Sequence, residues 1–114
     1  VHAQEPNWFA TAPVGAVNKV LAKSGWSVKD VDLWEVNEAF AVVPMALMHD
    51  LKLSHDIVNV NGGACALGHP IGASGARIMT TLLHEMERRQ VRYGLQAICC
   101  AGGLATSTVY ENVS

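Results

Sequence analysis

Residues 57–75 read Ile-Val-Asn-Val-Asn-Gly-Gly-Ala-Cys-Ala-Leu-Gly-His-Pro-Ile-Gly-Ala-Ser-Gly. The first four residues form a β-branched run that predicts a short strand, and the glycines that follow allow the chain to turn sharply. Small residues from Gly72 onward lead into a segment that ends at Arg88 and Arg89, as expected of a long helix that packs tightly at its start. This stretch therefore predicts a strand, a loop and a helix.

The sequence on either side extends this alternation, because apolar residues recur at helical spacing in some segments and β-branched residues cluster in others. Further helices are predicted at residues 13–24 and 39–51, and further strands at 31–36, 95–101 and 106–111, with a hairpin turn at 102–105. The order is α-β-α-β-α-β-β. It indicates a single α/β domain over residues 1–114, in three layers, with helices on both faces of a sheet.

Composition restricts the possible partners. Of 114 residues, 50% are hydrophobic and 16% are charged, and the formal charge is only −2, so nucleic acid is not expected as a partner. No run approaches the roughly 20 apolar residues of a membrane span, and the N-terminus does not resemble a signal peptide. We therefore expect a soluble cytoplasmic protein without a membrane partner. The low charged fraction predicts that part of the surface is covered in a larger assembly, such as a homo-oligomer.

Three polar clusters follow predicted strands, at Asn37-Glu38, at Gly68-His69-Pro70 and at residues 99–103. Ligand sites in open α/β sheets usually form at the carboxyl ends of strands. Each cluster also has a purely structural interpretation. Asn37 could cap the following helix, and a lone histidine in a loop is often a hydrogen-bonded structural group, although imidazole is also the usual general base near neutral pH.

The adjacent cysteines Cys99 and Cys100 should point to opposite faces of their strand, so only one can face a site. Both could instead be small buried hydrophobes, which is a common environment for free cysteine. Gly102 and Gly103 favour a site, because glycines let backbone N–H groups approach a ligand and form an oxyanion hole. No metal site is expected, since Cys65-x3-His69 is not a recognised zinc spacing, and no nucleotide-binding fingerprint is present.

These residues resemble the C-terminal domain of the thiolase family. Residues 37–40 resemble its N-E-A-F block, residues 61–75 its G-H-P-x-G-x-S-G signature, and residues 99–111 its closing C-x-G-G-G block. Residues 6–14 resemble the entry to that domain, so the similarity spans nearly the whole chain. It implies a thiolase-like C-terminal half with a mixed sheet, from an acetyl-CoA acetyltransferase or 3-ketoacyl-CoA thiolase.

The resemblance also implies a role for each site residue. His69 would activate a nucleophilic cysteine and donate to the thioester oxygen, and Asn37 would hold a water at the same oxyanion site. Cys99 would exchange the α-proton of the second acyl-CoA. The backbone N–H of Ala101 would contribute to a second oxyanion hole, and Phe40 would line the pantetheine end of the pocket. Coenzyme A and acyl-CoA would be substrates, and no resident cofactor is expected.

Cys99 is favoured over Cys100 because ungapped matching from Gly94 and from Glu111 places it at the family position. Ala101 and the pair Leu104-Ala105 depart from the family's usual glycines. The family nucleophile belongs to an N-terminal half that these residues do not contain, and Cys65 is expected to be a packing residue. The chain alone is therefore expected to be inactive. The alternative is a thiolase-like binding module without catalysis, which a parent gene lacking an upstream nucleophilic cysteine would favour.

Overall fold

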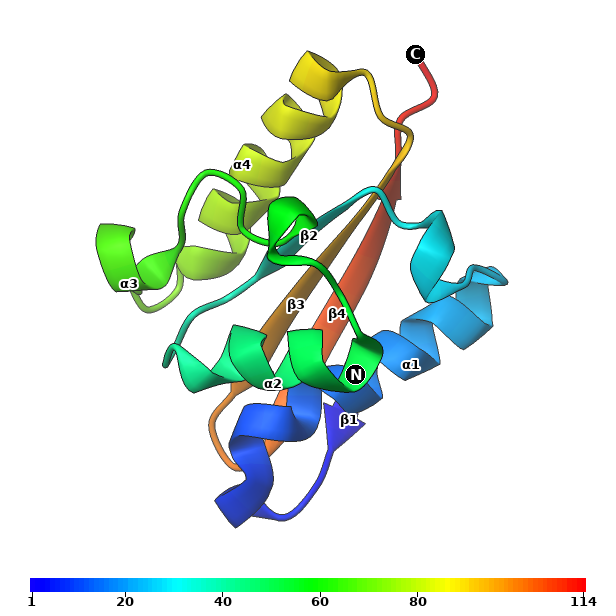
Figure 1. The fold of residues 1–114 in the computed structure, drawn as a ribbon. Coiled ribbons are helices and arrows are strands. Elements are labelled where there is room, and N and C mark those ends of the chain that lie inside the picture. The colour runs from blue at the N-terminus through cyan, green and yellow to red at the C-terminus, as the bar shows by residue number, and fades with distance from the viewer.

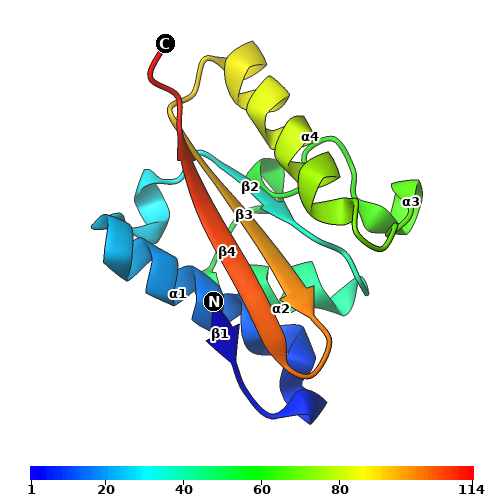
Figure 2. The same ribbon diagram turned by 180° about the vertical axis from the view of Figure 1, so that it is seen from behind.

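The computed structural model describes residues 1–114 and contains one four-stranded sheet. The strands lie in the order β1, β4, β3, β2, as Figure 2 shows. Their bounds are β1 His2–Ala3, β2 Leu33–Val36, β3 Tyr93–Cys100 and β4 Leu104–Glu111. β2 runs parallel to β3, whereas β3 and β4 form an antiparallel hairpin and β1 pairs antiparallel with β4. The sheet is therefore mixed, as predicted.

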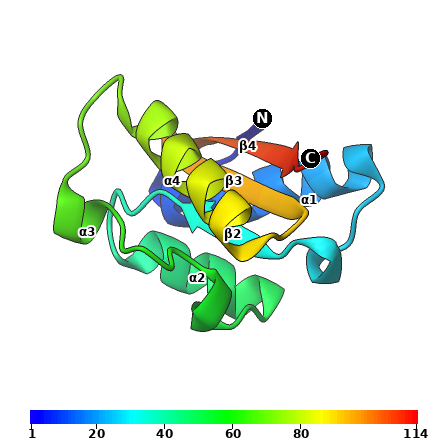
Figure 3. The same ribbon diagram turned by 90° about the horizontal axis from the view of Figure 1, so that it is seen from above.

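Helices cover both faces of this sheet (Figures 1 and 3). α1 (Ala12–Ser24) and α2 (Val42–Leu51) pack on one face, and α4 (Ser74–Arg89) packs on the other. Short 3-10 helices at Pro6–Thr11, Val28–Asp30 and His55–Ile57 and the single-turn helix α3 (Ala64–Leu67) connect these elements. None of the helices is long and apolar enough to cross a membrane. The three-layer α/β class expected from the sequence is confirmed.

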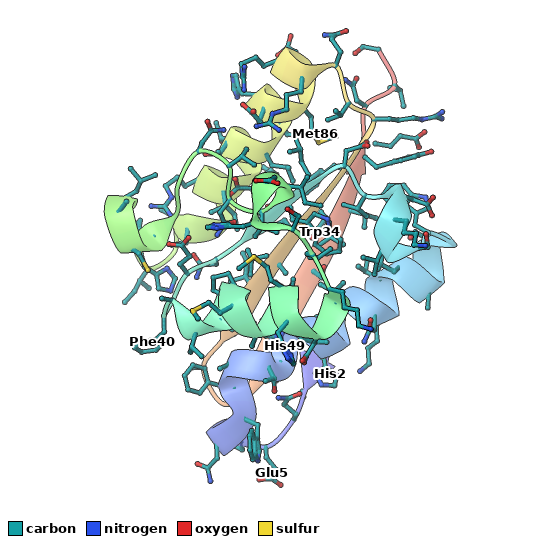
Figure 4. All side chains as sticks on the ribbon, in the orientation of Figure 1. His2, Glu5, Trp34, Phe40, His49 and Met86 are labelled. Carbon is teal, nitrogen blue, oxygen red and sulfur yellow. The ribbon has the colours of Figure 1, made fainter.

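The face under α1 and α2 holds the largest apolar cluster. Leu47 is completely buried and Trp34 is 1% exposed, and Figure 4 shows Trp34 between α2 and the strands. The buried members are Val17, Leu21, Val31, Trp34, Val36, Val43, Leu47, Val58, Leu95, Ala97 and Cys99. Alternate β3 residues belong to this cluster because successive side chains of a strand point to opposite faces.

The face under α4 combines apolar and polar residues. Leu33, Leu82 and Met86 form a small buried cluster. Next to them, Glu35 is 3% exposed and Gln96, its register partner on β3, is 7% exposed. The Gln96 amide oxygen accepts a hydrogen bond from the Tyr110 hydroxyl at 3.2 Å. The sheet therefore has one face with a buried apolar cluster and one face on which polar side chains are also buried.

The strand predicted at residues 57–60 is wrong. Val58 forms only an isolated parallel bridge with Trp34, and Asn59 has a positive φ of 49°, which ends the extended conformation. The Asn59 side chain completes the pairing instead, because Oδ1 accepts from Val36 N at 2.8 Å and Nδ2 donates to Val36 O at 2.9 Å. The predicted order α-β-α-β-α-β-β therefore loses one strand, while β1 and α3 are additional elements.

Several boundaries also differ. The hairpin turn lies at residues 101–103 rather than 102–105. Gly103 has a φ of 79°, and the backbone N–H of Gln4, near the start of the chain, donates to its carbonyl at 3.0 Å. A Cβ at Gly103 would overlap the Gln4 carbonyl, so this turn requires glycine. α2 begins at Val42 rather than residue 39, which places Pro44 in the first turn, where an N–H has no partner inside the helix.

Candidate active site

A cleft of about 270 Å³ opens at the end of β3. Four segments distant in sequence meet there: the 3-10 helix at Pro6–Thr11, the turn after β2, the loop before α4 and the β3–β4 turn. The lining residues are Pro6, Phe9, Ala39, Phe40, His69, Cys99, Cys100, Ala101 and Gly102. Two other hollows near the C-terminus, beside Met86 and Val113, contain neither histidine nor cysteine. The cleft therefore collects four of the five predicted site residues.

The fifth, Asn37, contacts the cleft through His69. Its Nδ2 lies 3.5 Å from His69 Nε2, and its backbone N–H donates to the Ala97 carbonyl at 2.9 Å. Asn37 is 1% exposed, and its Oδ1 is buried without a partner. The capping alternative is not realised, because α2 has Ala41 at its N-cap and no side-chain cap.

His69 is held on a loop that contacts the start of α4. Its Nδ1 lies 2.6 Å from the Ser74 hydroxyl, which also donates to the Pro70 carbonyl at 3.0 Å. Arg77 donates to the carbonyl of Gly68, the residue before His69. The loop is therefore tied to the first turn of α4 on both sides of the imidazole.

Glu38 joins the turn after β2 to the glycine-rich loop. One carboxylate oxygen accepts from Asn59 Nδ2 and the other from the Cys65 backbone N–H, both at 2.9 Å. Burial acts to raise the pKa of Glu38, but the hydrogen bonds from Cys65 and Asn59 outweigh it and hold the pKa below its ordinary value. A Cβ at Gly63 would overlap this carboxylate, so a larger residue there would displace the Glu38 side chain from its present position.

The three cysteines have different environments. Cys99 is 7% exposed, and burial, with a smaller contribution from Cys100, raises the pKa of its thiol. Cys100 is half-buried and also borders the cleft, so the choice of Cys99 continues to depend on the sequence match. Cys65 is exposed, which contradicts its expected packing role; α3 turns it outward beside Glu38, and a hydrogen bond to that carboxylate raises its pKa.

Phe40 and Ala101 border the cleft at its rim. The Phe40 ring is 61% exposed and packs edge-on against Phe9, with ring centroids 5.8 Å apart. Figure 4 shows Phe40 at the start of α2, pointing away from the sheet. Ala101 is exposed in the β3–β4 turn. No group of three or more His, Cys, Asp or Glu side chains is arranged to hold a metal ion.

Sequence reasoning missed three residues that organise this region: Asn59, Ser74 and Arg77. Asn59 and Ser74 lie inside the quoted signature stretch, where small polar residues among glycines could have been examined as hydrogen-bond partners. Arg77 had no comparable signal, because an arginine on a helix is usually a surface residue.

A family model described as the C-terminal domain of thiolase matches residues 1–112. The chain belongs to the thiolase family. This thiolase chain is 50% identical over 107 residues to an acetyl-CoA acetyltransferase of Chromobacterium violaceum, covering 94% of the chain and 27% of that relative. It is 48% identical over 103 residues to the cytosolic acetyl-CoA acetyltransferase of Mus musculus, covering 90% of the chain and 26% of that relative.

The thiolase fold is also found in a solved structure. Human mitochondrial 3-ketoacyl-CoA thiolase superposes with a TM-score of 0.95 at 42% identity, covering 98% of this chain and 28% of that one. The chain therefore spans about a quarter of the length of the relatives it matches.

Proposed function

We propose that this domain supplies the acid/base groups of a thiolase that transfers acyl groups between coenzyme A thioesters. The observation that carries the proposal is the cleft at the end of β3, where an imidazole and a buried thiol from distant segments border one space. Acyl transfer through a thioester needs both a base for the nucleophile and an acid or base for the α-carbon.

The proposed synthetic reaction begins when His69 takes the proton of a nucleophilic cysteine from the N-terminal half. The thiolate attacks an acyl-CoA thioester, and coenzyme A leaves with the proton of the Cys99 thiol, so that Cys99 becomes a thiolate. Cys99 then removes the α-proton of a second acyl-CoA. The resulting carbanion attacks the acyl-enzyme, a carbon–carbon bond forms, the carbon–sulfur bond to the nucleophile breaks, and the nucleophile regains its proton from His69.

In cleavage the same groups act in reverse, and Cys99 protonates the departing acetyl-CoA carbanion. Burial keeps its thiol neutral at pH 7, which suits the donating role. His69, with a water on Asn37, would stabilise one oxyanion, and the Ala101 N–H would stabilise the other. The unpartnered Oδ1 of Asn37 supports such a contact, because buried acceptors normally find a donor. Phe40 would line the pantetheine end.

The complete enzyme would include an N-terminal half with the nucleophile, and the present residues alone would be inactive. We propose a homo-oligomeric protein of the cytoplasm. The word cytosolic in the name of the mouse relative supports the compartment, although the human structure is of a mitochondrial enzyme. The proposed substrates are coenzyme A and acyl-CoA thioesters.

The test is His69→Ala in the full-length enzyme, with thiolysis of acetoacetyl-CoA by coenzyme A as the assay. We expect turnover to fall by more than about 10³-fold, because one lost oxyanion donor costs roughly 10²–10³ and the lost base adds to this. His84→Ala is the matched control, since His84 is exposed on α4 and bonds only the Thr80 carbonyl. Near-normal turnover of the His69 variant would rule out the assigned role.

A further inference from the structure

Both ring nitrogens of His69 face a neighbouring side chain. Nδ1 lies 2.6 Å from Ser74 Oγ, and Nε2 lies 3.5 Å from Asn37 Nδ2. Ser74 is the first residue of α4 and is only 5% exposed. It lies behind the imidazole and does not line the cleft. Its position raises the question of which nitrogen carries the proton in the neutral ring.

The Ser74 hydroxyl has one proton, and the Pro70 carbonyl lies 3.0 Å away as an acceptor for it. When the hydroxyl donates to Pro70, only its lone pairs remain for His69, so Nδ1 must be the protonated nitrogen. An amide nitrogen can only donate, so Asn37 Nδ2 requires a lone pair on Nε2. Two separate contacts therefore favour the same tautomer.

The opposite tautomer would need two coordinated changes. The Ser74 hydroxyl would have to turn away from Pro70 and donate to Nδ1. Asn37 would also have to rotate its amide, because otherwise two donors would face each other at Nε2. Each change alone leaves a donor without an acceptor in a buried site, which costs about 1–3 kcal/mol for a polar group.

We propose that Ser74 is a positioning residue that fixes His69 as the Nδ1–H tautomer and keeps the Nε2 lone pair available as the base. This inference rests on the proposed function of His69 as activator of the nucleophile. Ser74 acts only through His69. Its own position is rigid because the Ala73 and Ser74 N–H groups also lie 3.2 Å from the Pro70 carbonyl, so the turn and the first turn of α4 form one unit.

The direct test is nuclear magnetic resonance of the chain labelled with ¹⁵N-histidine, in which the pattern of proton–nitrogen correlations identifies the tautomer. The His69 signals are assigned by their loss in His69→Gln. We expect the Nδ1–H pattern in the wild type and in Ser74→Thr, which keeps the hydroxyl. Ser74→Ala should shift His69 toward Nε2–H. A wild-type ring in the Nε2–H form, or an unchanged pattern in Ser74→Ala, would overturn the proposal.

Thr80→Ala is the matched control. Thr80 also donates its hydroxyl to the carbonyl four residues earlier, Ala76, at 2.8 Å, but it is exposed and makes no contact with His69. Both variants therefore remove the same kind of bond from α4. We expect the His69 pattern to be unchanged in Thr80→Ala, and a shift as large as that of Ser74→Ala would show that the effect is a general loosening of the helix.

Kinetics of the full-length enzyme provide a second measurement. Ser74→Ala should lower kcat by about 10–100-fold with little change in KM, as is typical when a partner that orients a histidine is lost. Thr80→Ala should retain wild-type values. A changed tautomer with unchanged kcat would overturn the positioning role. High activity of His69→Ala would instead refute the proposed function, and the tautomer result would stand by itself.

Discussion

On one face of the sheet, Trp34 and Leu95 belong to an apolar cluster that α1 and α2 cover, whereas on the other face Glu35 and Gln96 lie buried under α4. The same strands supply both sets, because adjacent residues of a strand point in opposite directions. His69 and Ser74 lie at the end of the polar face, at the start of α4. The comparison indicates that the first face, which also includes Cys99, stabilises the fold mainly by apolar packing, and that the second face buries polar and charged side chains.

This division predicts two kinds of response. Substitutions on the apolar face should act through lost packing and should depend little on pH. Substitutions of buried carboxylates on the α4 side should act through charge, so their effect should change sign or vanish as pH changes. Measuring the free energy of unfolding at several pH values can therefore separate the two faces.

The largest effect is expected from Leu47→Ala on the apolar face. Leu47 is completely buried, and removing a buried leucine costs about 2–5 kcal/mol through lost transfer energy and the cavity left behind. Urea unfolding should show this loss equally at pH 5 and pH 8. Leu83→Ala is the control, because Leu83 lies on α4 but is 43% exposed, and it should cost much less. Equal losses for the two variants would break the proposed difference between the faces.

A smaller, pH-dependent effect is expected from Glu35→Gln. Burial raises the pKa of Glu35 to about 7; Glu38 adds to the shift and Arg77 opposes it. The folded state therefore keeps a proton that the unfolded state loses near pH 4.5, so the wild type loses stability as pH rises from about 4.5 to 7. The variant should match the wild type at pH 4 and exceed it at pH 8, by up to about 3 kcal/mol. Equal stabilities at pH 8 would show that the carboxylate is well solvated.

How much of this could be predicted from the sequence depends on the kind of interaction. The helices and the hairpin follow from periodicity, and the cleft residues His69 and Cys99 follow from motif spacing. The prediction of a strand at residues 57–60 failed because a run of β-branched residues looks the same whether backbone groups or a side chain complete the pairing with the neighbouring strand. Here Asn59 bonds both backbone groups of Val36, a contact across 23 residues that no local pattern reveals.

The Ser74 contact was missed for a related reason. A serine at a helix start is expected to cap its own helix. Ser74 instead bonds backward to Pro70 and sideways to His69, and both contacts depend on how the preceding loop folds. The burial of Glu35 was not predicted either: helices were expected on both faces of the sheet, but alternation does not show which strand residues lie directly under a helix.

The smallest effect is expected from Glu85→Gln, which also sharpens the comparison because its sign is opposite to that of Glu35. Hydrogen bonds, first from Arg88 and then from Asn61 and Arg89, lower the pKa of Glu85 to about 2. Arg88 Nε donates at 2.9 Å and Asn61 Nδ2 at 3.1 Å, while the arginines themselves stay partly exposed and screened by water. The ionised carboxylate therefore contributes stability above about pH 4.5 that disappears as pH falls toward 2.

We expect the Glu85→Gln variant to lose no more than about 1 kcal/mol at pH 7, as is usual for ion pairs near the surface. Near pH 2 it should be as stable as the wild type. Urea unfolding at both pH values measures this difference, and Glu87→Gln on the same helix is the control, because no hydrogen bond to its carboxylate is seen. A loss for Glu85→Gln that stays constant down to pH 2 would mean that the side chain acts by packing and that the α4 side is less dependent on charge than the contacts of Glu85 indicate.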